Sequence, residues 1–428
     1  MSEIIIPYFE IYIFIYVSFE LFKEYLNYRQ YLKNLQKEMP EEIKPYFEEK
    51  VFKKTQKYKK AMAEFVLLKS FVHLSELVVA LWIGILPKIW EQSISLANKI
   101  VTSPYLDKTG MIIFILYFLI LNMFFDLPFD LYHTFVIEEN HKMNKISLKL
   151  FIKDNNLQLI LSWIIASFLF YFILIILEMK IKYFYLYIWA LTLAFGLLFT
   201  VIFPHLIQPC FNKVVPLEEG SLKEKILVCC KKEGFPLKKI YVIDGSTRSA
   251  HSNAYFYGFF TKHIVLFDTL IKNLKEEEII AVLWHEIGHW KYWHDKIFLF
   301  IAMIYVFGLL FIFSLITQNS YIAQCFGFYS FSNFVSFVIF CLLVNPTDFI
   351  LRFFMFWISR RNERIADLYA VTNGYGQELK NGLIKLTKDN LGNLNPDPYY
   401  SLFNYTHPTI VDRIKCITMA LKLTNKND

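Results

Sequence analysis

The sequence predicts an all-α polytopic membrane protein that carries a small α+β segment outside the membrane. Two observations lead to this fold class. The 428 residues are 55% hydrophobic and only 19% charged, whereas about a quarter of the residues in a soluble domain are charged. Seven apolar stretches also reach the length of about 20 residues that a helix needs to cross a bilayer. These spans are expected at 4–22, 64–87, 110–132, 157–178, 183–207, 297–318 and 328–358.

Basic residues gather in alternate loops between the predicted spans. Eleven Lys and Arg residues lie between positions 23 and 60, and four Lys lie between 142 and 153, while the loop between the sixth and seventh spans has no charged residue. Cytosolic loops carry an excess of Lys and Arg. We therefore expect the odd-numbered loops in the cytosol and the N-terminus on the opposite side.

The spans divide the chain into four parts. Residues 1–207 hold spans one to five with their loops, and residues 297–358 hold spans six and seven. Only 208–296 and 359–428 are long enough to form a soluble domain, and the charge bias places both in the cytosol. The net charge of +7 does not indicate nucleic acid as a partner, because no basic stripe interleaved with aromatic residues lies in a soluble segment.

A zinc-binding pattern, His285-Glu286-Ile287-Gly288-His289, lies on a predicted helix after three glutamates that suit its first turn. His285 and His289 are four residues apart and share one face of that helix, so their imidazoles can bind one zinc ion. Glu286 is placed to activate a zinc-bound water rather than to bind the metal. The alternative is an ordinary helix with two surface histidines.

A third metal ligand is expected directly after the last span. Catalytic zinc sites use three protein ligands and keep one position for water. Glu363 would bind the metal, and Asp367, four residues on, would accept a hydrogen bond from a zinc-bound histidine. The alternative is a solvated helix with Arg–Glu pairs. Spans six and seven return the chain to the membrane face that it left after His289. This return favours the interpretation of Glu363 as a metal ligand.

A further histidine, His294, is expected not to bind the metal. It lies five residues beyond His289, about 140° round a continuous helix. It would then point away from the zinc face. We interpret it as a membrane-interface residue beside Tyr292 and Trp293.

These motifs resemble the type I CAAX prenyl protease family, the integral-membrane zinc metalloproteases of the endoplasmic reticulum. The resemblance covers nearly the whole chain and rests on several separate stretches. Besides the two zinc motifs, these are Leu127-Pro128-Phe129 with Thr134 to Glu139, Arg248 to Gly258, and His407-Pro408 with Asp412-Arg413.

The resemblance implies seven transmembrane helices that enclose a water-filled chamber, with one zinc ion at its cytosolic end. Such a chamber would explain why His73, Glu76 and Asp126 lie within the spans. Local pairing between helices is the alternative. The family also implies the endoplasmic reticulum membrane as the location, with the active site toward the cytosol, and we expect a monomer.

Two short strands are predicted before the zinc helix. Residues 253–258 alternate and are rich in aromatics, and 264–267 form a second apolar run after a turn near Thr261. A peptide can add to an exposed strand edge. By resemblance, Asn253 and Ala254 supply that edge to the substrate, with Tyr255 beside them. A purely structural hairpin is the alternative.

By resemblance, His407 points at the active site. There it would donate a hydrogen bond to the oxyanion that forms during attack, and Arg413 would support the same substrate-binding region. From the sequence alone, His407 would cap a helix, because Pro408 suits a first helical position.

The resemblance implies a protease that removes the last three residues of proteins ending in Cys-aliphatic-aliphatic-X whose cysteine is prenylated, in some members with a second upstream cut. Membrane lipid is an expected partner, because a prenyl chain partitions into lipid. One alternative is a quality-control zinc protease that cuts membrane proteins without a prenyl group. A transporter or scaffold with a vestigial metal site is another.

Overall fold

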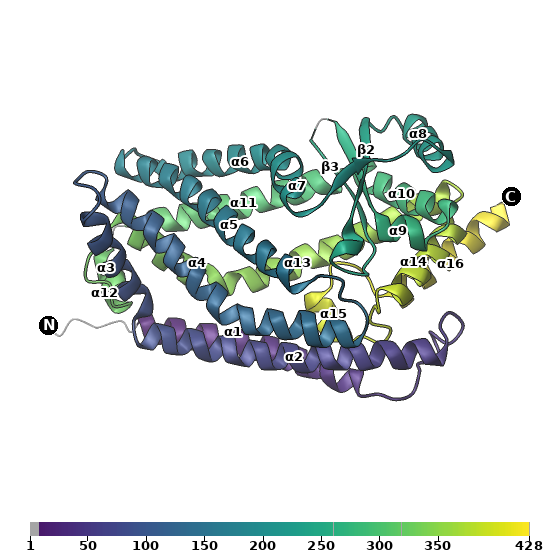
Figure 1. The fold of residues 1–428 in the computed structure, drawn as a ribbon, viewed down its shortest axis with the longest axis horizontal. Helices are drawn as coiled ribbons and strands as arrows, with labels where there is room; N and C mark the ends of the chain where they lie inside the picture. The colour runs from purple at the N-terminus through teal and green to yellow at the C-terminus, as the bar shows by residue number, and fades with distance from the viewer. Residues whose placement is uncertain (1–7, 260, 318, 428) are drawn as a thin grey trace.

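The computed structural model describes residues 8–259, 261–317 and 319–427 as a long bundle of helices with a small sheet at one end (Figure 1). Shorter helices and turns connect the main elements. The long helices are α1 (Tyr8–Asn34), α2 (Glu49–Trp82), α4 (Leu106–Tyr132), α5 (Leu148–Glu178), α6 (Phe184–Ile202), α11 (His294–Ile316) and α13 (Asn333–Thr372). The short ones are α3 (Ile85–Asn98), α7 (Gln208–Phe211), α12 (Ser320–Cys325) and α15 (Pro398–Asn404). Two segments are π-helical, η1 (His133–Glu138) and η2 (Phe203–Ile207), and one is a 3-10 helix, η3 (Gly245–Thr247).

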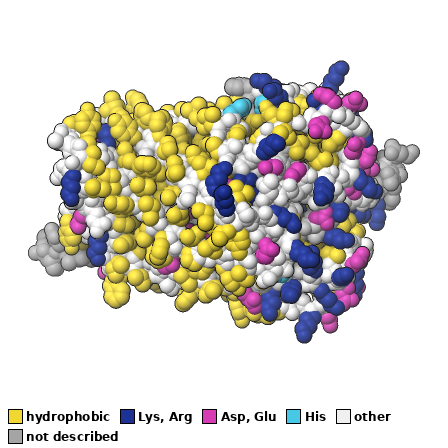
Figure 2. Space-filling model, in the orientation of Figure 1, with side chains coloured by type: hydrophobic (Ala, Val, Ile, Leu, Met, Phe, Trp, Pro, Cys, Tyr) yellow, Lys and Arg dark blue, Asp and Glu magenta, His cyan; other side chains and the backbone are white. Residues whose placement is uncertain are grey.

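Six helical stretches in the described part of the chain are long and apolar enough to cross a membrane. They overlap the last six predicted spans, so apolar helices of sufficient length are confirmed at these six places, with bounds that differ by a few residues. The first predicted span, 4–22, begins outside the described residues and continues into α1, so a seventh crossing stays a prediction. The surface over the helices is largely hydrophobic, whereas charged side chains concentrate at the end that holds the sheet (Figure 2).

The ionisable residues inside the spans pair between α2 and α4. Lys69 Nζ lies 2.8 Å from Asp126 Oδ1, and His73 Nε2 lies 3.4 Å from the same oxygen. His73 Nδ1 is also 3.3 Å from Glu76 Oε2. These side chains are 24–41% exposed. The structure therefore contains the local pairing that the sequence left as an alternative, and the chamber stays an expectation of the resemblance.

The four-stranded sheet has the order β1-β2-β4-β3, which leaves β3 at an edge. Its strands are β1 (Val214–Pro216), β2 (Leu237–Ile243), β3 (Ala254–Tyr257) and β4 (Lys262–Phe267). β2 and β4 are parallel, and the other pairs are antiparallel. The predicted hairpin of β3 and β4 is confirmed, whereas β1 and β2 were not predicted. Gly258 in its turn has a φ of +105°, and a Cβ there would lie 2.0 Å from the carbonyl oxygen of Thr261.

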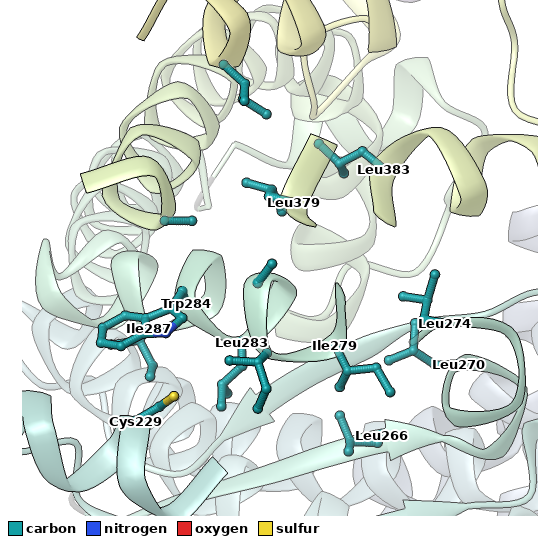
Figure 3. Packing of buried hydrophobic residues seen from close by; sticks show 14 of the residues in the cluster. Cys229, Leu266, Leu270, Leu274, Ile279, Leu283, Trp284, Ile287, Leu379 and Leu383 are labelled. Atoms are coloured by element: carbon teal, nitrogen blue, oxygen red, sulfur yellow. The ribbon is translucent and has the colours of Figure 1, made fainter. Parts of the chain in front are cut away.

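One hydrophobic core joins segments that are far apart in the sequence. Helix α10 (Glu276–Lys291) lies between Leu266 of β4 on one side and Leu379 of α14 (Gly376–Asp389) on the other, and its Leu283 points toward the sheet (Figure 3). The core also takes in α8 (Ser221–Glu233), α9 (Asp268–Asn273), α16 (Ile410–Asn427) and buried residues of the loop between α1 and α2 such as Phe47. The segments 208–296 and 359–428 therefore lie together at one end of the bundle.

Helices α10 and α13 cross at close range in this core. Gly288 of α10 sits so near α13 that a Cβ at this position would lie 3.1 Å from the Cα of Ala366 and 3.1 Å from the Cβ of Tyr369. Ala366 is fully buried. Small residues on both helices thus allow the two backbones to approach. α13 runs without interruption past the predicted boundary at 358, so the last span and Glu363 belong to one helix.

We predict that Gly288→Val destabilises the protein, because the new side chain has no room between α10 and α13. Overpacking of this kind costs about 1–3 kcal/mol. Gly308→Val in α11 is the matched control, since a Cβ at Gly308 meets nothing within 4 Å. The midpoint of thermal unfolding in detergent should fall for the first variant and change little for the second. Equal midpoints would show that the crossing tolerates a larger side chain.

Candidate metal centre

Helix α10 presents the zinc motif because its N-terminus is well stabilised and its inner face is apolar. Three glutamates occupy the first turn, and the backbone N–H of Lys275 donates to Glu278 Oε2 at 2.9 Å. Negative charge at a helix N-terminus is favourable. One turn separates His285 from His289, so both imidazoles leave the same face of α10 toward α13.

The structure brings His285, His289 and Glu363 together. The two Nε2 atoms of the histidines lie 3.2 Å apart. Glu363 Oε1 is 3.1 Å from His289 Nε2, and Glu363 Oε2 is 3.4 Å from His285 Nε2. His285 and Glu363 are buried, and His289 is 19% exposed. The predicted ligand set is therefore one compact cluster, although its role as a ligand set stays a prediction.

These distances suit a tetrahedral metal ion. Ligand atoms about 2.0–2.1 Å from zinc are separated by roughly 3.4 Å along a tetrahedral edge, close to the 3.1–3.4 Å seen here. Within the described residues, the buried Glu363 Oε2 has no hydrogen-bond partner. A carboxylate oxygen buried without a hydrogen bond is costly. The cations nearest to this oxygen are His285 Nε2 at 3.4 Å and Arg413 Nη1 at 3.6 Å, neither of which donates a hydrogen bond to it. The donor set and this oxygen both fit a bound cation.

Asp367 contacts His285 on the ring nitrogen that does not face Glu363, and Arg413 binds Asp367. Asp367, which is fully buried, places Oδ1 2.8 Å from His285 Nδ1. Arg413 of α16 donates to both oxygens of Asp367, from Nε at 2.9 Å and from Nη2 at 2.6 Å. A buried charge that loses its partner costs about 3–5 kcal/mol, so this pair anchors α16 to α13. The predicted contact of Arg413 with substrate stays a prediction.

The electrostatics of the cluster favour positive charge. Burial alone would lower the pKa of His285, but the carboxylates of Asp367 and Glu363 raise it to about 10. The carboxylates thus create a site that attracts a cation, a role that a bound metal ion would fill in place of a proton. Burial also raises the pKa of Glu286, which makes this carboxylate a better proton acceptor.

Glu286 points into a cavity of about 690 Å³ that lies among α6, α11 and β3. The edge strand lines the same cavity from Tyr255 to Gly258, and His289 lines it too. Its remaining walls are mostly apolar and aromatic. They include Gly196, Leu197, Phe199, Phe203, Phe298 and Leu299.

His407 lies beside the cluster, with Nε2 3.4 Å from Glu363 Oε1, and its side chain is 60% exposed. The sequence-based alternative that His407 caps a helix is wrong. Thr409 caps α16 instead, since its hydroxyl accepts the backbone N–H of Asp412 at 3.2 Å, and α16 begins at Ile410. His407 is therefore left free to face the site.

The expectation that His294 points away from the zinc face is wrong, although the residue begins a candidate membrane span. It is buried, and its Nδ1 lies 2.9 Å from Nδ1 of His289. The extrapolation failed because α10 ends at Lys291 and α11 begins at His294, with Trp293 between them at a φ of +59°. Neither Gly nor Pro marks this break in the sequence, so no local signal could have revealed it.

The segment that leads into β3 is tied to the loop between α4 and α5. Asn144 pairs with Ser249, and the backbone N–H of Lys145 donates to the carbonyl of Arg248 at 3.1 Å. Arg248 also forms a two-pronged ion pair with Asp154 of α5, at 2.8 and 3.1 Å. The position of the edge strand thus depends on the membrane helices.

A second link uses Glu138, a buried residue of η1. Its carboxylate accepts a hydrogen bond from the Tyr58 hydroxyl and lies 3.7 Å from His251 Nε2. Both links connect the segment 248–258 to the bundle.

Comparisons with known proteins agree with this architecture. Residues 28–213 match the family described as CAAX prenyl protease N-terminal, five membrane helices, and residues 216–420 match peptidase family M48. The chain is 35% identical to the CAAX prenyl protease 1 homolog of Arabidopsis thaliana, over 98% of this chain and all of that protein. It is 35% identical to CAAX prenyl protease 1 of Saccharomyces cerevisiae, over 92% of each.

A solved structure is also similar. The crystal structure of S. mikatae Ste24p superposes with a TM-score of 0.88 at 34% identity, covering 95% of this chain and 98% of that one. Full-length similarity in sequence and in fold includes both the membrane helices and the metal-binding segment. The chain therefore belongs to the CAAX prenyl protease 1 family within peptidase family M48, and it is a multi-pass membrane metalloprotease.

Proposed function

We propose that this protein is a zinc metalloendopeptidase that removes the C-terminal tripeptide from prenylated CaaX proteins. The observation that carries the proposal is the shared cavity, in which a free strand edge, Glu286 and His289 all face one apolar space between two candidate membrane helices. A peptide on that edge would bring its scissile bond to the metal cluster while an attached apolar chain lies in the same space.

His285, His289 and Glu363 would hold one zinc ion, with Asp367 orienting His285. Zinc in such a site lowers the pKa of a water molecule to about 7 and polarises the scissile carbonyl. Glu286 takes the proton of the attacking water on its carboxylate and delivers it to the leaving amine. His407 donates a hydrogen bond to the developing oxyanion; its exposed side chain beside Glu363 supports this role.

The peptide adds to β3 as a further strand. Asn253 is exposed at the start of this edge, and its side-chain oxygen accepts the backbone N–H of Ala254 at 2.9 Å. The hydroxyl of Tyr255 accepts a hydrogen bond from Gln208 Nε2 at 2.7 Å, which fixes that ring in the cavity wall. Main-chain hydrogen bonds along an edge bind peptides with little regard to side chains, so Asn253, Ala254 and Tyr255 hold the substrate while Arg413 supports the region beneath it.

The prenyl chain occupies the apolar cavity between α6 and α11. Burial of each methylene group contributes about 0.8 kcal/mol, so a cavity of this size is a large source of affinity for a C15 or C20 chain. The basic loops support a cytosolic site, and the family supports the endoplasmic reticulum membrane. We propose a monomer as the active form, because one chain supplies a complete metal-ligand set.

Cleavage of a farnesylated CaaX peptide by the purified full-length protein tests the proposal. We expect cleavage three residues from the C-terminus, loss of activity with a zinc chelator, and recovery on adding zinc. The same peptide without its farnesyl group should be cut far more slowly. Equal cleavage of the two peptides would favour a quality-control protease, and the absence of any cleavage would favour a transporter or scaffold.

We predict that Glu286→Gln retains one zinc ion per chain and loses cleavage, because an amide cannot accept the proton of the attacking water. The expected fall in kcat is about 10²–10⁴-fold. Glu277→Gln is the control, since Glu277 lies on the exposed first turn of the same helix. Activity that survives in Glu286→Gln would rule out Glu286 as the general base.

We predict that Gly196→Phe raises KM for the farnesylated peptide. Gly196 lines the cavity, and a Cβ there meets nothing within 4 Å, so the ring can enter the cavity without distorting α6. Displacing about two methylene groups from the cavity, at about 0.8 kcal/mol each, raises KM roughly tenfold. Gly308→Phe in α11, which is not among the cavity residues, serves as control. An unchanged KM in Gly196→Phe would place the prenyl chain elsewhere.

A further inference from the structure

The two histidines of the zinc motif have different partners on their outer nitrogens. His285 presents Nε2 to Glu363 and Nδ1 to Asp367, at 3.4 and 2.8 Å. His289 also presents Nε2 to Glu363, at 3.1 Å, but its Nδ1 faces Nδ1 of His294 at 2.9 Å. Histidines that bind a metal through one nitrogen almost always donate the other ring N–H to an acceptor. Among the described residues, the atom in hydrogen-bond range of His289 Nδ1 is therefore His294 Nδ1.

The backbone is bent so that His294 can reach this position. On a straight continuation of α10, His294 would point away from His289. The chain instead turns at Trp293, whose φ of +59° is rare for a residue with a large side chain, and α11 starts one residue later. Unusual backbone conformations of this kind gather at functional sites. The turn returns the His294 ring toward α10.

The surroundings of His294 hold its ring in one orientation. The residue is 3% exposed, and its ring stacks on Tyr292 with a centroid distance of 6.0 Å and an interplanar angle of 21°. The rings of His289 and His294 meet edge to face, 5.0 Å apart at 73°. This arrangement points one ring nitrogen at another rather than stacking the two faces, as a hydrogen bond requires.

We propose that His294 is a positioning residue that accepts the Nδ1 hydrogen of His289 and so fixes His289 with its Nε2 toward the metal. Only one hydrogen fits between the two Nδ1 atoms. When His289 binds a metal through Nε2, that hydrogen belongs to His289. His294 is then neutral and carries its own hydrogen on Nε2. The proposal rests on the zinc site proposed above. In it, His285 has the charged acceptor Asp367, and His289 has the neutral acceptor His294.

The test compares zinc affinity in purified full-length protein by competition with a chromophoric chelator. His294→Leu removes the acceptor, and the zinc dissociation constant should rise about 10–100-fold. His294→Asn keeps an acceptor oxygen on Cγ, where histidine carries Nδ1, and should retain most of the affinity. The control is His263→Leu, since His263 is another buried histidine, in β4, and stacks on Tyr257. It should bind zinc as the wild type does.

Rescue by Asn separates positioning from packing, because Leu fills the space as well as Asn does. Wild-type affinity in His294→Leu, or equal loss in the Leu and Asn variants, would overturn the proposal. If the Leu variant does not fold, His294→Gln replaces it; its acceptor lies one bond farther out, so equal affinity in Gln and Asn would also overturn the proposal. A wild-type protein that binds no zinc would instead overturn the zinc site itself.

Discussion

The close crossing of α10 and α13 is the constraint on which the site depends. Two histidines on one helix and a glutamate on another can share a metal only if the two helices pack within reach of these side chains. Gly288 and Ala366 make that approach possible, because neither places a side chain of any size between the helices. The same α13 is also a candidate membrane span, so the site is fixed directly to the bundle.

Close packing places several charges in a buried region, and the structure pairs them. Arg413 neutralises Asp367, and Asp367 orients His285. The second carboxylate, Glu363, faces the two histidines, His407 and Arg413, whose Nη1 is 3.6 Å away, but one of its oxygens accepts no hydrogen bond. Buried charges are tolerated only when they are paired or bind a metal. The arrangement is therefore that of a site built for a cation, in which one histidine has a charged acceptor and the other a neutral one.

Much of the fold and site could be predicted from the sequence. Apolar length predicted six helices that the structure contains, and alternation followed by a turn near Thr261 and a second apolar run predicted the hairpin of β3 and β4. The spacing of His285 and His289 predicted a shared face, and the return of the last two spans predicted that Glu363 lies nearby. Strands β1 and β2 were missed, because β1 has only three residues and the strands of a parallel pair lie far apart along the chain.

The sequence by itself determined the chemistry: which residues can bind a metal, which carboxylate can move a proton, and which stretches cross a membrane. These properties are local, since they depend on side-chain type and on helical or strand periodicity. The tertiary structure alone decided that Arg413 lies behind Asp367, that β3 and Glu286 share one cavity with α6 and α11, and that His294 turns back to His289. Each of these depends on a helix crossing or a backbone turn that no short sequence pattern specifies.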